Sequence, residues 1–147
     1  MNHQEKPYHV LIADDVEEEC CILKTAIHHY SKWELVGEVH SADMLLAYLQ
    51  GEKPYHDRSE HPFPDPLLMD AILPKGRATD VIRWVNDHPE SALKVVILAG
   101  ALIADYCGLL ISQGAHAWVR KTGDPKLLEC FINRIASELH NNMENRR

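Results

Sequence analysis

The sequence has no long hydrophobic run. Its apolar stretches, such as Val95 to Leu98, are only a few residues long, whereas a membrane-spanning helix needs about 20 consecutive apolar residues. Residues 1–7 are polar and do not resemble a signal peptide. These absences predict a cytoplasmic protein that does not contact membranes.

Cysteine is scarce, with four residues among 147. Cys20 and Cys21 are adjacent and no pair has CxxC spacing, so we expect reduced, mostly buried cysteines rather than a disulfide framework. The ten histidines are scattered, and no set has the spacing of a zinc site.

Positive charge is in the minority. Lys and Arg number 15 against 22 Asp and Glu, which gives a formal net charge of −7. Binding to nucleic acid or to an anionic membrane depends on clustered positive charge, so we expect neither partner. The chain is 46% apolar and 25% charged, which is typical of a globular domain. We expect an N-terminal tail at 1–7, one domain at 8–140 and a polar C-terminal tail at 141–147.

Five short apolar segments alternate with five helical patterns. The expected strands are 8–13, 33–39, 67–69, 95–98 and 117–119, and the expected helices are about 16–30, 42–50, 78–86, 103–113 and 125–139. This alternation predicts a parallel sheet covered by helices on both faces. The fold class is therefore α/β, a flavodoxin-like doubly wound (βα)5 sandwich whose five parallel strands have the order 2-1-3-4-5.

The segment 52–66 is a long loop rich in proline, histidine and charge. Loops of this length are often functional. It is interpreted either as a contact for a partner or as a surface insertion.

Acidic residues stand where the first and third strands end. Asp14 and Asp15 follow the first strand, Asp70 follows the third, and Lys121 follows the fifth. The first and third strands are neighbours in the expected order, so the three carboxylates should meet at the carboxyl edge of the sheet, where open α/β sheets bind ligands. Like charges disfavour one another's ionisation. Mg²⁺, which prefers hard oxygen ligands, would resolve the conflict.

A phosphoryl group at this edge would meet the metal on one oxygen and Lys121 on another, as phosphoryl transfer requires. Asp70 is the expected nucleophile, because a carboxylate can form an aspartyl phosphate. Taken singly, Asp14 and Asp15 have the pattern of a turn and helix cap, and Lys121 that of a surface charge. The functional interpretation depends on finding the three aspartates and the lysine together, each at the carboxyl end of the expected strand.

Four segments resemble the receiver domain of two-component response regulators, in the same order along about residues 8–140. They are residues 10–15, 66–74, 95–100 and 114–121. Residues 48–58 further resemble the stand-alone regulators that partner phytochrome-type and related sensor kinases.

The resemblance implies that Asp70 accepts phosphate from a histidine kinase or phosphotransfer protein and that Lys121 contacts the phosphoryl group. The Mg²⁺ ligands it implies are Asp14, Asp15, Asp70 and the backbone carbonyl of Ile72. Trp118 stands where the family has an aromatic that changes rotamer on activation. We therefore expect a phosphoacceptor signalling domain rather than an enzyme, with output through a downstream protein partner. A homodimer is compatible with the family resemblance.

Several positions depart from the family pattern. Ala99 replaces the usual Thr or Ser, so the hydroxyl that follows the phosphoryl group is missing, while Gly100 keeps the next position small. Thr122 replaces the usual cis-proline, which predicts a trans bond there, and Ala78 replaces a usual glycine. An alternative is therefore a receiver-like adaptor that works without phosphorylation. A metal-dependent phosphatase is disfavoured because Ile72 stands where such enzymes have a second Asp.

Overall fold

The computed structural model describes residues 6–30, 32–100 and 103–144. Its centre is a sheet of five parallel strands in the order β2-β1-β3-β4-β5. The strands are β1 (Tyr8–Ala13), β2 (Trp33–Val39), β3 (Pro66–Asp70), β4 (Lys94–Ala99) and β5 (Ala117–Arg120). Both the predicted strand order and the predicted parallel direction are confirmed.

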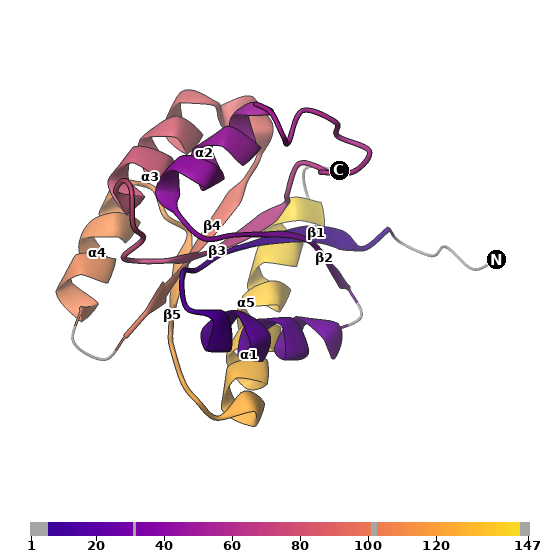
Figure 1. Ribbon diagram of the computed structural model, residues 1–147. Coiled ribbons are helices and arrows are strands. Elements are labelled where there is room, and N and C mark those ends of the chain that lie inside the picture. Colours follow the sequence, from indigo (N-terminus) through magenta and orange to yellow (C-terminus); the bar gives the residue numbers. More distant parts are fainter. Residues whose placement is uncertain (1–5, 31, 101–102, 145–147) are drawn as a thin grey trace.

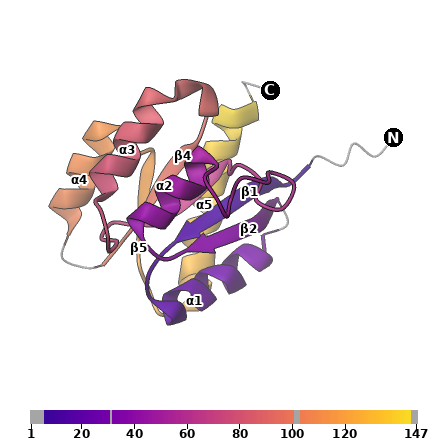
Figure 2. The ribbon, with the colours of Figure 1, turned by 45° about the horizontal axis from the view of Figure 1, so that its top comes forward.

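Helices cover both faces of the sheet. They are α1 (Glu17–His28), α2 (Ala42–Gln50), α3 (Ala78–Asp87), α4 (Ala104–Gln113) and α5 (Pro125–Glu144), with a short 3₁₀ helix η1 (Pro89–Ser91) before β4. In Figures 1 and 2, α1 and α5 lie together on one face and α2, α3 and α4 on the other. The doubly wound sandwich predicted from the sequence is confirmed.

The sheet divides the interior into two apolar cores. Along β1, Leu11 and Ala13 belong to the core beneath α2, α3 and α4, while Val10 and Ile12 belong to the core beneath α1 and α5. This split follows from the two-residue alternation of side chains along a strand. Because both faces are covered, the strands are apolar on both sides, as parallel sheets require.

Local signals set the ends of the helices. Ser41 precedes α2, and its Oγ accepts a hydrogen bond from the Met44 amide at 3.3 Å. Gly51 ends α2 in the left-handed conformation at φ 69°, which glycine adopts without steric cost. Asp124 precedes α5 and accepts from the Lys126 amide at 3.0 Å. These contacts confirm the predicted start and end of α2 and the predicted start of α5, whereas α1 is shorter than the predicted 16–30.

Helix α5 is longer than the sequence pattern predicts. It continues to Glu144, four residues beyond the expected end of the domain at residue 140. No glycine or proline follows Leu139, so the polar residues continue the helix instead of beginning a separate tail.

The long loop between α2 and β3 is fixed to the end of α2. The Arg58 guanidinium donates to the backbone carbonyl oxygens of Leu49 at 3.0 Å and His61 at 3.2 Å. The Tyr48 hydroxyl donates to the Pro62 carbonyl oxygen at 2.9 Å. The loop is thus an ordered extension of α2, and its role as a partner contact stays a prediction.

All four cysteines are free. Cys20 and Cys107 are buried, but Cys21 and Cys130 are exposed on the outer surfaces of α1 and α5. The prediction that most are buried is therefore wrong for two of them, because their helix positions face solvent. Within the described residues, no helix has both the length and the apolar character to cross a membrane.

An aromatic cluster joins the end of α5 to the amino edge of the sheet. The Trp33 indole Nε1 donates to His140 Nε2 at 2.7 Å, and the His140 ring stacks on Tyr8 with 4.0 Å between ring centroids. All three side chains are buried. The hydrogen bond therefore links α5 to β2 in a region that water does not reach.

Replacing Trp33 with Phe should lower the free energy of unfolding by about 1–3 kcal/mol, the usual cost of leaving a buried polar atom without its donor. Urea denaturation followed by circular dichroism measures this change. Trp84→Phe is the matched control, because the Trp84 indole nitrogen has no protein hydrogen-bond partner among the described residues. Equal losses in the two variants would show that the Trp33–His140 bond contributes nothing.

Candidate functional site at the carboxyl edge of the sheet

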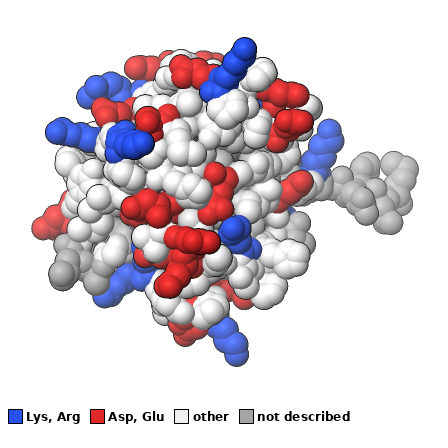
Figure 3. Space-filling model, viewed as in Figure 1, with Lys and Arg blue, Asp and Glu red and all other residues white. Residues whose placement is uncertain are grey.

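Three carboxylates meet where β1 and β3 end. Asp14, Asp15 and Asp70 each bring one oxygen to within 4.8 Å of the others. Figure 3 shows acidic side chains gathered near the middle of one face, over the start of α1. The convergence predicted from the strand ends is confirmed.

The register between β1 and β3 produces this convergence. Ala13 pairs with Met69, so the next residue of each strand, Asp14 and Asp70, reaches the same level. Asp14 is fully buried, Asp70 is nearly so, and Asp15 is exposed. One oxygen of each buried carboxylate is fixed by a backbone amide two residues on: Asp14 Oδ1 accepts from Val16 at 3.0 Å, and Asp70 Oδ1 accepts from Ile72 at 3.1 Å.

Lys121 brings the positive charge. Its Nζ lies 2.7 Å from Asp70 Oδ2 and 3.1 Å from Asp14 Oδ2. Its backbone amide donates to the Ala99 carbonyl oxygen at 2.7 Å, which sets the position of the side chain beyond β5. Burial lowers the pKa of Lys121, but hydrogen bonds to Asp70 and Glu19 more than offset this and raise it above its ordinary value. The amine is therefore charged.

Glu19 also belongs to the site, and sequence reasoning missed it. Its carboxylate pairs with the Lys121 ammonium across 102 residues of sequence. Burial raises the pKa of Glu19, partly offset by Lys121. The sequence shows Glu19 as one of three glutamates in the first turn of a helix, where the helix dipole alone explains acidic residues. One feature of the sequence could have indicated Glu19. Helix α1 begins shortly after β1 ends, so the first turn of α1 lies beside the carboxyl edge of the sheet.

The donor set fits a hard divalent cation. Asp14 Oδ2 is buried and accepts no hydrogen bond from the described residues, and Lys121 is its ionic neighbour. Three carboxylates pair with the Lys121 ammonium and Asp15 lies beside two of them, so the cluster keeps an excess of negative charge. Oxygen ligands of this kind suit Mg²⁺. Asp14, Asp15 and Asp70 would hold the ion.

Solved structures with the same arrangement of strands and helices are response regulators. The response regulator RPA3017 in red light signaling of R. palustris superposes with a TM-score of 0.77 at 24% identity, covering 88% of this chain and 90% of that chain. The phosphorylated cyanobacterial phytochrome response regulator RcpA gives 0.74 at 21% identity, covering 88% and 91%. The Mn²⁺-bound form of response regulator Rcp1 gives 0.73 at 20% identity, covering 89% and 93%.

The chain has the receiver fold. The resemblance seen in the sequence, including that to the phytochrome response regulators, is confirmed at the level of the fold. No protein-family model matches the chain.

Other positions named in the family resemblance lie at or near the ends of β4 and β5. Ala99 ends β4, is fully buried and offers no hydroxyl. Gly100 follows it, and a Cβ added there would meet no atom of the described residues beyond its chain neighbours within 4 Å. The bond between Lys121 and Thr122 is trans, as the sequence predicts. Trp118 is 40% exposed on the outer strand β5.

Ile72 lies on the loop after β3 with 63% of its surface exposed. Its amide fixes Asp70, as described above. The metal-ligand role of its carbonyl, like the switch roles of Ala99, Gly100 and Trp118, stays a prediction.

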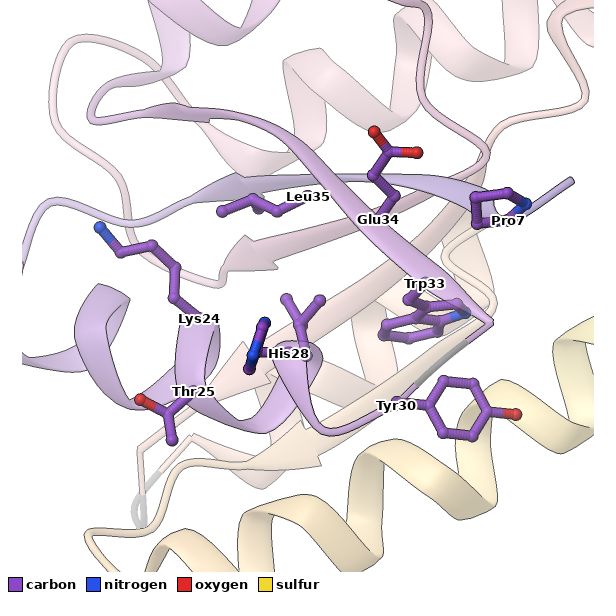
Figure 4. Close-up of a pocket in the computed structure, with 9 residues that line it drawn as sticks. Pro7, Lys24, Thr25, His28, Tyr30, Trp33, Glu34 and Leu35 are labelled. Carbon is purple, nitrogen blue, oxygen red and sulfur yellow. The ribbon is translucent and has the colours of Figure 1, made fainter.

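A groove of about 730 Å³ lies between α1 and β2, away from the acidic cluster. Pro7, Trp33 and Tyr30 line its end at the amino edge of the sheet, and Lys24 lies at the other end (Figure 4). None of the residues that line it belongs to the carboxylate cluster. The chemistry of the site therefore does not extend into this groove.

Asp70→Asn should raise the melting temperature of the metal-free protein at pH 7 by about 2–5 °C, a typical shift for a single favourable change in a domain of this size. Burial raises the pKa of Asp70 above its ordinary value of 3.8, and Lys121 only partly offsets this. The folded state therefore holds the Asp70 proton to higher pH than the unfolded chain, and the ionised carboxylate costs stability at neutral pH.

Thermal melts in EDTA at several pH values test this. As pH falls through the raised pKa towards 3.8, wild-type Asp70 gains its proton and the difference between the two proteins should shrink. Asp87→Asn, on the exposed end of α3, is the control and should melt like wild type. A variant less stable than wild type at pH 7 would contradict the prediction.

Proposed function

We propose that the chain is a response-regulator receiver. Asp70 accepts a phosphoryl group from a histidine kinase or phosphotransfer protein, in a Mg²⁺-dependent step, and the output is a protein–protein contact. The observation that carries this proposal is the Lys121 ammonium between Asp70 and Asp14 at the carboxyl edge of the sheet.

Each group of the site has a task in this proposal. Asp70 Oδ2 attacks phosphorus, the bond from phosphorus to the donor nitrogen breaks, and that nitrogen keeps the electron pair. Lys121, already 2.7 Å from Asp70 Oδ2, stabilises the negative charge of the transferred group. Bound Mg²⁺ supplies further charge neutralisation on the phosphoryl oxygens. Asp14, Asp15 and Asp70 would hold the ion through their side chains, and Ile72 would hold it through its carbonyl oxygen.

Two of the similar structures support these assignments. RcpA is described as phosphorylated, and Rcp1 as bound to Mn²⁺. Both have the fold of this chain, and in this chain the carboxyl edge of the sheet carries a carboxylate cluster suited to a divalent ion.

Incubation with acetyl phosphate and Mg²⁺ should add one phosphoryl group to the wild-type chain, and Asp70→Asn should abolish the addition. Intact-protein mass spectrometry measures both. Asp87→Asn should be phosphorylated like wild type, because the end of α3 lies at the opposite edge of the sheet from the cluster. A wild-type protein that gains no mass would refute the proposal.

Asp15→Asn should weaken Mg²⁺ binding at least about tenfold, since even outer-shell changes around metal ligands cost this much. The exposed position of Asp15 makes a folding defect unexpected. The measurement is the Mg²⁺ concentration that half-saturates phosphorylation by acetyl phosphate, with tryptophan fluorescence as a second readout.

Glu17→Gln removes an equally exposed charge from the adjacent first turn of α1. It should change Mg²⁺ binding much less than Asp15→Asn. Equal effects would mean that Asp15 acts through general charge and not as a ligand.

A second candidate function is a receiver-like adaptor that binds its partner without phosphorylation. The buried Ala99 favours it, because no hydroxyl at the end of β4 can follow a phosphoryl group. In that case wild type and Asp70→Asn should bind the downstream partner equally, with and without acetyl phosphate. A large phosphorylation-dependent difference in partner affinity excludes it.

A further inference from the structure

A second group of metal-ligating side chains lies on the α1 side of the sheet, outside the carboxylate cluster. Cys20, Glu38 and His40 each bring one ligand atom to within 4.8 Å of the others. Cys20 is in the first half of α1, Glu38 is near the end of β2, and His40 follows β2 directly. These donors do not have the spacing of a zinc motif in the sequence, and only the fold brings them together.

The topology explains how they meet. β2 is the outer strand beside β1, with Glu38 opposite Ile12, and Ile12 belongs to the core beneath α1 and α5. Val39 enters the opposite core. Because side chains alternate along an extended chain, Glu38 and His40 both lie on the α1 side. Cys20 belongs to the core on this same side.

The distance between the His40 and Glu38 ligand atoms is close to the distance between neighbouring ligands in a zinc site. His40 Nε2 lies 3.3 Å from Glu38 Oε1, while Lys24 Nζ lies 3.1 Å from Glu38 Oε2. In a tetrahedral zinc site neighbouring ligand atoms are about 3.5 Å apart, given metal–ligand bonds of roughly 2.0–2.3 Å. Glu38 Oε1 is therefore the ligand oxygen, and Lys24 can stay on Oε2, where it orients the carboxylate.

The three donor side chains differ in how far they are exposed to solvent. Cys20 is fully buried, the Glu38 side chain is 23% exposed and the His40 side chain is 54% exposed. The thiol would thus form the floor of a site that opens to solvent beside His40. Three protein ligands leave a fourth tetrahedral position, which faces water.

We propose that Cys20, Glu38 and His40 form a binding site for a borderline-soft divalent ion of the Zn²⁺ type, with water as its fourth ligand. Sulfur, imidazole nitrogen and one carboxylate oxygen are the donors that Zn²⁺ selects, whereas Mg²⁺ prefers an all-oxygen site such as the Asp14, Asp15 and Asp70 cluster. On binding, the ion forms a bond to Cys20 Sγ, the S–H bond breaks, and the proton passes to solvent.

Burial, and then Glu38, raises the pKa of the Cys20 thiol to about 12. Without metal the thiol keeps its proton, and its Sγ donates to the Asp14 carbonyl oxygen at 3.5 Å. The two metal sites share no side chain. This proposal therefore stands whether or not Asp70 is phosphorylated.

Co²⁺ is the probe, because a cobalt–thiolate bond gives a charge-transfer band and tetrahedral Co²⁺ gives strong visible bands. The full chain carrying Cys21→Ser and Cys130→Ser, which removes the exposed thiols, is titrated with Co²⁺ in excess Mg²⁺. We expect both sets of bands to saturate at one ion per chain and to disappear when Zn²⁺ is added. Asp70→Asn in the same background should keep them.

Further variants in that background locate the site. Cys20→Ser should abolish the thiolate band, while Cys107→Ser, which removes the other buried thiol, should keep it. His40→Gln, an exposed change that does not threaten the fold, should weaken Co²⁺ binding at least tenfold, and His56→Gln, exposed on the α2–β3 loop, should not. Absence of a thiolate band in the parent chain, its persistence in Cys20→Ser, or unchanged affinity in His40→Gln would overturn the proposal.

Discussion

The structure depends on the gathering of like charges at one edge of a parallel sheet. The registers of β1 and β3 bring Asp14 and Asp70 to the same level. Asp15 follows Asp14 directly, and the first turn of α1 adds Glu19. Such a group is unfavourable unless positive charge lies among it. Lys121 provides that charge from the far strand β5, so its ammonium joins the first, third and fifth strands of the fold. The proposed metal and phosphoryl chemistry uses the negative charge that Lys121 leaves uncompensated.

Much of this could be predicted from the sequence. Strands that are buried on both faces appear in the sequence as continuous apolar runs. The alternation of these runs with helical patterns predicts the strand order. Asp14 and Asp70, at the ends of two runs, predict the position of the site. Ser41 and Asp124 mark helix starts because their side chains accept a hydrogen bond from a backbone amide of the first turn. Gly51 marks a helix end because it adopts the left-handed conformation. These features depend on short stretches of chain, which is why sequence reasoning finds them.

The features that could not be predicted from the sequence are of two kinds. Some depend on contacts between residues far apart in the sequence, and one, the length of α5, depends on the absence of a helix-terminating residue. Glu19 and Lys121 pair across 102 residues, and in the sequence Glu19 looks like any acidic residue of a first helical turn. The order of the α2–β3 loop comes from Arg58 reaching two carbonyl oxygens. Cys20, Glu38 and His40 become neighbours only when α1 packs on β2. The extra length of α5 reflects polar residues that continue a helix as well as they form a tail.

The two edges of the sheet differ in how they are held. At the amino edge, Trp33 and His140 share a buried hydrogen bond among stacked rings, which no ion or solute can replace. At the carboxyl edge, the contacts around Lys121 are ion pairs, which are sensitive to ions in solution. Ions in solution should therefore loosen the contacts at the carboxyl edge and leave the buried ring contacts at the amino edge unchanged. Amide hydrogens should therefore exchange along a gradient, slowest beside Trp33 and fastest in the loops that carry the charged groups.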